Sequence, residues 1–116
     1  MVEYTIEFKC REYKKAKPDL RKSIEKGMRK LVDLIESKEQ SGTAFEKIFN
    51  DDVLKYDILG KNFYTFKFRC GDSTQLRLLY KFNRAENKVE LHKFYEKRHS
   101  GKEYMAEFQR YVNMAG

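Results

Sequence analysis

The stretch QLRLLYKFNRAENKVELHKFY, residues 75–95, decides the fold class, because apolar and polar side chains alternate along it in two runs. Such alternation is typical of half-buried strands. Residues 83–87, NRAEN, form a turn that joins the predicted strands 75–82 and 88–95 as an antiparallel pair. Upstream, FYTFKFR at residues 63–69 alternates in the same way. The sequence therefore predicts an antiparallel meander of three strands.

Two kinds of element are predicted before this meander. Residues 2–9, VEYTIEFK, alternate and are rich in strand-forming residues, which indicates a strand at or near a sheet edge. From Pro18 onward, apolar residues recur at steps of three and four, which predicts an amphipathic helix that ends near residues 41–42. A short second helix is expected over residues 44–49.

A short helix is predicted at the C-terminal end, where SGKE at residues 100–103 has the spacing of a capping box. The length of 116 residues and the 41% hydrophobic content are typical of a single domain, residues 1–116, with one modest core. The expected fold is α+β. Its N-terminal strand and helices pack on one face of a four-stranded, mostly antiparallel sheet, and the short C-terminal helix follows.

The net charge of +7 is concentrated in the second half of the chain. Residues 1–60 carry 13 basic and 12 acidic side chains, whereas residues 61–116 carry 12 and 6. A localised positive field attracts anionic partners, and nucleic acid is the first candidate. An acidic protein would be attracted by the same field.

Cysteine content and hydropathy limit the cellular context. Cys10 and Cys70 stand alone without the spacing of a zinc site, so a disulfide framework or structural metal is not indicated. No signal-peptide core or uninterrupted apolar run of membrane-spanning length is present in the sequence. We therefore expect a cytoplasmic protein with no membrane association, metal or cofactor.

The alternation in the meander also predicts where the cations lie. It places Lys67, Arg69 and Arg77 on the sheet face that points away from the amphipathic helix, where they are expected to be exposed. Cations of this kind can stabilise the charge that develops on a phosphate when RNA is cleaved, and a side chain that exchanges protons completes the chemistry. These three residues are equally compatible with the ordinary solvated face of an antiparallel sheet.

Three other side chains have a functional and an ordinary interpretation. His92 and His99 are ordinary surface histidines on the pattern alone, although imidazole titrates near neutral pH. Tyr104, at the start of the terminal helix, fits a core position as well as a site position. From residues alone, the prediction is a basic α+β domain that binds nucleic acid.

The order of elements and the residues at the strand ends resemble the RelE/ParE superfamily of bacterial toxin components. The similarity covers most of the chain. Its most specific motifs are RLLY at residues 77–80, and KR at residues 97–98 with Tyr104 six positions after the arginine. The resemblance implies an mRNA interferase, a metal-independent endoribonuclease toxin that cuts mRNA at the ribosome. It also implies control by a cognate acidic antitoxin as partner.

The resemblance assigns roles by position. Lys67 matches a lysine that serves as base or transition-state cation, Arg77 and Arg98 match arginines that contact the scissile phosphate, and Tyr104 matches a tyrosine that stacks on or orients the nucleotide. Thr65 replaces a second lysine of many ribosome-dependent members, so His99 is the candidate general acid or base. Further cations expected to hold RNA are Arg69, Lys81 and Lys97.

Three alternative functions share this fold or its charge. A toxin of the ParE branch binds DNA gyrase without cutting RNA, and an inactive RelE-like protein still binds nucleic acid or an antitoxin. A plain nucleic-acid-binding module is the third class. The joint presence of Lys67, Arg77, Arg98 and Tyr104 favours the ribonuclease branch.

Overall fold

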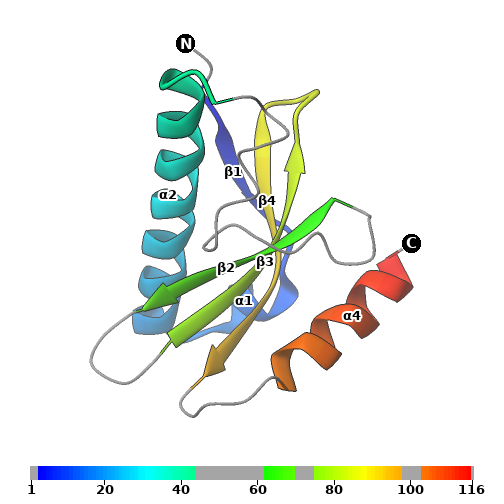
Figure 1. Ribbon diagram of the computed structural model, residues 1–116. Helices are drawn as coiled ribbons and strands as arrows, with labels where there is room; N and C mark the ends of the chain where they lie inside the picture. The colour runs from blue at the N-terminus through cyan, green and yellow to red at the C-terminus, as the bar shows by residue number, and fades with distance from the viewer. Residues whose placement is uncertain (1–2, 44–61, 70–74, 98–102, 116) are drawn as a thin grey trace.

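The computed structural model describes residues 3–43, 62–69, 75–97 and 103–115 of the chain. Within these ranges the fold is α+β, with a mixed four-stranded sheet flanked by helices (Figure 1). In chain order the elements are β1 (Thr5–Phe8), α1 (Arg11–Lys15), α2 (Pro18–Gln40), β2 (Phe63–Arg69), β3 (Gln75–Asn83), β4 (Lys88–Lys97) and α4 (Glu103–Ala115). The predicted strands and both predicted helices at 18–40 and after residue 100 are confirmed, whereas α1 was not predicted. The helix expected over residues 44–49 lies outside the described residues.

The strands lie in the order β1-β4-β3-β2. The pairs β2/β3 and β3/β4 are antiparallel, which confirms the meander, and β1 pairs with β4 in parallel. The N-terminal strand therefore lies at a sheet edge, as its sequence indicated. A register shift between Leu79 and Tyr80 marks an irregularity in the β3/β4 pairing.

Helix α2 covers one face of the sheet. Pro18 occupies its first turn, where a missing amide hydrogen costs nothing, and Gly42 beyond its end has a φ of 85°, which favours glycine. The apolar stripe of α2 packs on the aromatic and aliphatic side chains of the strands to form the main core. Its fully buried members include Ile24, Met28, Leu31 and Ile35.

Gly27 lets α2 approach the sheet closely. A Cβ atom at this position would lie 3.0 Å from Phe68 Cδ2 and 3.1 Å from Leu78 Cδ1. Both distances are shorter than ordinary carbon contacts. Glycine is therefore favoured at position 27 by packing rather than by its backbone angles.

Helix α4 lies on the opposite face of the sheet (Figure 1), which corrects the expectation that this face is open to solvent. Phe63 and Leu79 lie on that face and form a second core cluster with Phe108 and Val112 of α4. The physical reason is that these apolar side chains interrupt the polar pattern of this face. They leave water only if another element packs over them, and α4 does so. No helix among the described residues is long and apolar enough to cross a membrane.

Candidate phosphate-binding site

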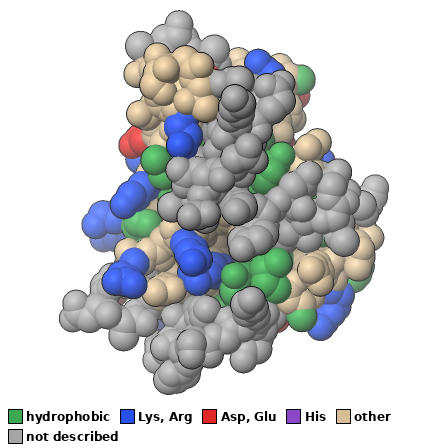
Figure 2. Space-filling model, in the orientation of Figure 1, with side chains coloured by type: hydrophobic (Ala, Val, Ile, Leu, Met, Phe, Trp, Pro, Cys, Tyr) green, Lys and Arg blue, Asp and Glu red, His purple; other side chains and the backbone are tan. Residues whose placement is uncertain are grey.

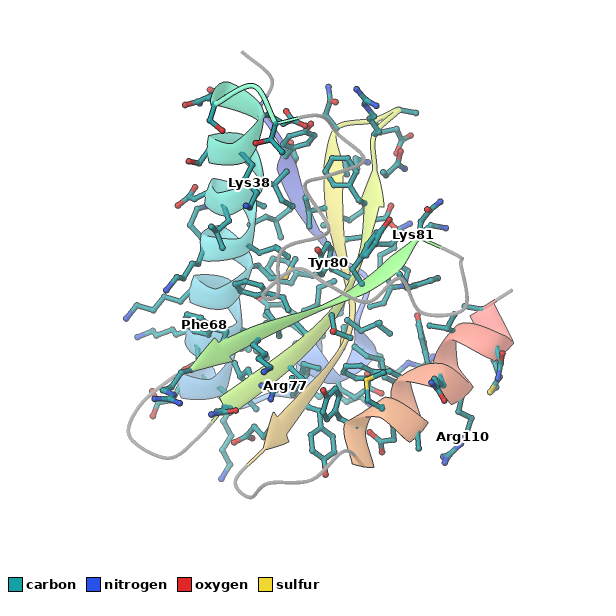
Figure 3. The ribbon with its side chains drawn as sticks, in the orientation of Figure 1. Lys38, Phe68, Arg77, Tyr80, Lys81 and Arg110 are labelled. Atoms are coloured by element: carbon teal, nitrogen blue, oxygen red, sulfur yellow. The ribbon has the colours of Figure 1, made fainter. Side chains whose placement is uncertain are left out.

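Arg77 lies under the first turn of α4 and is only 5% exposed. The prediction that its side chain is exposed is therefore wrong. The cover is Tyr104, whose ring centroid lies 5.2 Å from the guanidinium carbon of Arg77. Figure 3 shows Arg77 in the lower half of the sheet, on the side where α4 begins. A guanidinium on an aromatic face is held by a cation–π interaction, which gains strength where water is excluded.

The guanidinium of Arg77 has hydrogen-bonding capacity that its neighbours do not use. Nη1 donates to Gln75 Oε1 at 3.2 Å, and Nε is buried with no hydrogen-bond partner among the described residues. No carboxylate in the described part of the chain forms an ion pair with Arg77. A buried cation without an anionic partner is costly, so the site is electrostatically suited to an anion.

A second cation lies directly opposite Arg77. Lys67 on β2 pairs in register with Arg77 on β3, so both side chains lie on the face covered in part by α4. Like charges in direct opposition across two strands destabilise a sheet. Lys67 is exposed, and exposed Arg69 lies two residues further along β2, opposite Gln75. In Figure 2, blue Lys and Arg side chains are more prominent on this view of the molecule than red acidic ones.

Two tyrosines complete the surroundings of Arg77. Tyr95 on β4 is its register partner on the other side, and the rings of Tyr95 and Tyr104 lie 6.3 Å apart. Tyr104 is 8% exposed and packs edge-on against Phe108, at 5.7 Å between centroids. Tyr104 is therefore a core residue that also covers Arg77. Of its two predicted roles, a core position fits this arrangement better than an open platform for stacking on a nucleotide.

The remaining predicted site residues are not all brought to Arg77. Lys81 lies four residues further along β3, about 13 Å away at roughly 3.3 Å per residue, and its ammonium lies 5.4 Å from the Phe63 ring centroid. Lys97 is the last residue of β4, opposite Gln75 in register. Arg98 and His99 lie outside the described residues. Of the predicted site residues that the structure describes, Lys67 and Tyr104 therefore flank Arg77, and Arg69 and Lys97 both pair with Gln75, two residues before it.

His92 belongs to a partly buried polar network that the sequence did not indicate. Its Nδ1 lies 2.9 Å from the Tyr111 hydroxyl on α4, and its Nε2 lies 3.0 Å from Glu90 Oε1. Glu90 is 4% exposed, and its other oxygen lies 3.3 Å from Lys9 Nζ. The interpretation of His92 as an ordinary surface histidine is wrong, because α4 covers it and its side chain is 12% exposed.

Burial and hydrogen bonding shift the titration of this network. Burial lowers the pKa of His92 below its ordinary value, and the hydrogen bond to Glu90 offsets only part of that effect. Burial alone would raise the pKa of Glu90, but hydrogen bonds from His92 and Lys9 outweigh it, so the pKa of Glu90 is lowered. At neutral pH a neutral His92 donates through Nε2 to the Glu90 carboxylate and accepts through Nδ1 from Tyr111. The network therefore fastens α4 to β4.

The cationic cluster around Arg77 and the network around His92 differ in the chemistry that they can perform. Arg77, Lys67 and Arg69 can bind phosphate and stabilise added negative charge on it. His92 has both ring nitrogens engaged, which suits it to holding α4 rather than to proton transfer with a ligand. Within the described ranges, no three His, Cys, Asp or Glu side chains gather in a way that could hold a metal ion. The candidate site is therefore a phosphate-binding one.

Comparison with known proteins finds no matching family model, curated protein or solved structure.

Proposed function

We propose that this chain is a RelE-like toxin, a metal-independent endoribonuclease that cuts mRNA at the ribosome and so inhibits translation. In this proposal Arg77 and Lys67 bind the scissile phosphate and stabilise the charge that develops on it. Arg98 contributes a second guanidinium, and Lys67 or His99 exchanges the proton. Arg69, Lys81 and Lys97 hold flanking phosphates of the RNA.

One observation supports this proposal most strongly. Arg77 is a buried guanidinium with an unpartnered Nε and no carboxylate partner among the described residues, and a second cation lies directly opposite it. A purely structural role for two adjacent cations would call for an acidic partner. A phosphate diester supplies that missing charge and accepts the unused hydrogen bonds in a bidentate geometry.

The burial of Arg77 also defines what the substrate must do. Tyr104 covers the guanidinium, so a phosphate reaches it from the side of Lys67, which is exposed. We expect the aromatic ring to hold the planar guanidinium in one orientation, as catalysis by a fixed charge requires. Lysine in place of Arg77 keeps the charge but loses that planar orientation.

The proposal is tested with ribosomes programmed with a 5′-labelled mRNA and a defined codon in the A site. Single-turnover cleavage is measured for the wild type and for Arg77→Lys, Lys67→Ala and His99→Gln. Loss of one transition-state contact should slow cleavage about 100-fold or more. Arg110→Ala is the matched control, because Arg110 is an exposed arginine on the outer side of α4 (Figure 3). This variant should cleave the mRNA at the wild-type rate.

The same variants also distinguish whether His99 or Lys67 acts as the general base. If His99 exchanges the proton, His99→Gln is severe and the rate follows a titration near pH 6.5, about the ordinary imidazole value. If Lys67 does so, Lys67→Ala is severe and His99→Gln is mild. A wild-type protein that leaves the programmed mRNA intact would refute the ribonuclease proposal.

A second candidate function is binding without cleavage, by an inactive RelE-like protein or a ParE-like gyrase-binding toxin. The observation that favours it is the cover over Arg77, which leaves this residue 5% exposed. In either case the proposed partner is a cognate acidic antitoxin, attracted by the basic second half of the chain. Translation assays and gyrase supercoiling assays with the same preparation distinguish the two functions.

A further inference from the structure

Helix α4 contacts the sheet through polar groups at two points. At its N-terminal end, the Tyr104 ring covers the guanidinium of Arg77. Two helical turns later, the Tyr111 hydroxyl lies 2.9 Å from Nδ1 of His92. At about 1.5 Å per residue the two tyrosines are roughly 10 Å apart along the helix axis, so one continuous helix connects the two contacts. A movement of α4 at His92 therefore also moves the cover over Arg77.

His92 meets α4 because it is the extra residue of a bulge in β4. In the register of β3 and β4, the paired residues of β4 pass from Lys93 directly to Leu91, so no β3 residue lies opposite His92. In a bulge two residues of one strand oppose one residue of the other, and their side chains are re-aimed. Tyr111 contacts both residues of this bulge, since the Lys93 ammonium lies 5.8 Å from its ring centroid. The bulge therefore directs two side chains of β4 at one tyrosine of α4.

The charged groups around His92 are mostly positive. Glu90 accepts a hydrogen bond from Nε2 of the imidazole, but it also forms an ion pair with Lys9 at 3.3 Å. The Lys81 ammonium lies over the Phe63 ring, and the centroid of that ring is 5.0 Å from the centroid of the imidazole. Among the described residues, the titratable groups that face His92 and Tyr111 are Glu90 and Lys93 on β4, Lys9 after β1, Lys81 on β3, and Cys10 and Glu12 at the start of α1. In this set three lysines face two carboxylates.

Protonation of His92 weakens its attachment to α4. Neutral His92 donates through Nε2 to Glu90 and accepts through Nδ1 from Tyr111. Once Nδ1 carries a proton it no longer accepts from the tyrosine hydroxyl, and the new positive charge lies beside Lys9 and Lys81 where α4 restricts the access of water. Burial, together with these two lysines, therefore keeps the pKa of His92 below its ordinary value against the opposing effect of Glu90. Docking of α4 is favoured above about pH 6.5 and loses stability as the pH falls below that value.

Helix α4 also separates from the sheet more easily than α2 does. Within the described residues α4 buries three side chains, those of Tyr104, Phe108 and Val112, whereas α2 buries six residues. A segment with few buried apolar contacts opens locally at a lower free-energy cost than unfolding of the whole domain. A small change in the attachment of α4 therefore shifts its docking equilibrium while α2 and the sheet stay folded.

We propose that His92 is a positioning residue for the Arg77 site, whose protonation loosens α4 from the sheet and moves Tyr104 away from the guanidinium. At neutral pH docked α4 keeps Arg77 covered. Below about pH 6.5 the docked population falls, and more of Arg77 is reached from the side of exposed Lys67. Binding of a phosphate to the uncovered guanidinium rests on the proposed function, whereas the release of α4 does not.

Hydrogen exchange of the full ¹⁵N-labelled chain tests this release. Protection factors, which correct for the intrinsic pH dependence of exchange, are measured between about pH 7.5 and 5 for the amides of Phe108 and Val112 and for the Nε–H group of Arg77. They should be lower than those of Met28 and Leu31 in α2 at every pH. They should also fall by up to about tenfold per pH unit below about pH 6.5.

Three variants define the role of the contact between His92 and Tyr111. His92→Gln should remove the pH dependence of the α4 protection factors, because glutamine does not titrate. Tyr111→Phe should lower these factors roughly fivefold at pH 7.5, which corresponds to the loss of one hydrogen bond. Tyr13→Phe is the matched control, because the Tyr13 hydroxyl donates to Glu25 of α2, on the other side of the sheet. This variant should keep the wild-type protection factors in α4.

Sulfate titrations at constant ionic strength separate this proposal from the proposed function. Sulfate keeps its double charge over this pH range, and the Nε–H signal of Arg77 reports its binding. The wild type should bind sulfate about three- to tenfold more tightly at pH 5.5 than at pH 7.5, and His92→Gln should lose this difference. Release of α4 without any binding of sulfate would uphold the role of His92 and contradict a phosphate site at Arg77.

Three results would overturn the role of His92. One is equal protection in α4 and α2 at every pH, because α4 would then leave the sheet only when the whole domain unfolds. Another is an Nε–H group of Arg77 that stays protected while the amides of α4 open. The third is a His92→Gln protein that keeps the wild-type pH profile.

Discussion

Replacing Arg77 by methionine should stabilise the protein while it abolishes RNA binding at the site. Methionine has a similar length and fills the space under Tyr104, so it leaves a smaller cavity than alanine does. It removes the buried charge and the unpartnered Nε, and it also removes the like charge opposite Lys67. A gain in stability together with a loss of RNA binding would mark Arg77 as a ligand-binding residue. Removal of a residue that serves the fold would lower the stability instead.

The size of the stability change follows from the contacts. An unsatisfied buried donor costs about 1–3 kcal/mol, and repulsion across the strand pair adds roughly 0.2–1 kcal/mol. Against these stand a cation–π contact of about 0.5–2 kcal/mol with Tyr104 and one hydrogen bond to Gln75 of about 1 kcal/mol. The midpoints of these ranges leave a net gain of about 0.4 kcal/mol, which raises Tm by roughly 1–2 °C for a domain of this length.

The measurement pairs urea unfolding at pH 7.5 with fluorescence anisotropy of a labelled oligoribonucleotide. Lys67→Met is the control. Lys67 is exposed, so its removal should weaken RNA binding and change the free energy of unfolding only by the relieved repulsion of roughly 0.2–1 kcal/mol. Destabilisation of Arg77→Met by 1 kcal/mol or more, with RNA binding unchanged, would show that the guanidinium serves the fold. The site assignment would then fail.

Two further predictions concern packing and titration. Because folded His92 has a lowered pKa, the unfolded chain takes up a proton first, so stability should fall as pH drops below about 6.5, by at most about 1.4 kcal/mol per pH unit. Glu90 should add a further loss of stability below about 4.5. His92→Gln should flatten the first part of this profile in urea unfolding, whereas His99→Gln should not. Gly27→Ala should destabilise by about 1 kcal/mol, since overpacking against Phe68 and Leu78 costs about 1–3 kcal/mol and helix propensity returns about 1. A more stable Gly27→Ala protein in thermal unfolding would contradict the close approach of α2.

Periodicity in the sequence determined the elements and most of their order. The strand at 63–69 matches β2, and the helix from Pro18 ends at Gln40, close to the stop expected at residues 41–42. These elements are local, because the pattern of apolar side chains and the turn residues between them specify which face is buried. The helix α1 was missed, since its five residues carry no periodic signal.

The candidate site depended on tertiary structure. The sequence identified Arg77, Lys67 and Tyr104 as residues of interest, but it placed Arg77 in solvent because alternation alone does not say what covers a sheet face. Docking of α4 buries Arg77 and gathers Glu90, His92 and Tyr111 into one network. The contact between His92 and Tyr111 joins residues 19 positions apart, and a register irregularity in the β3/β4 pairing lies beside it. Local pattern therefore determined the elements, whereas the long-range packing of α4 decided which charges are buried and which side chains meet.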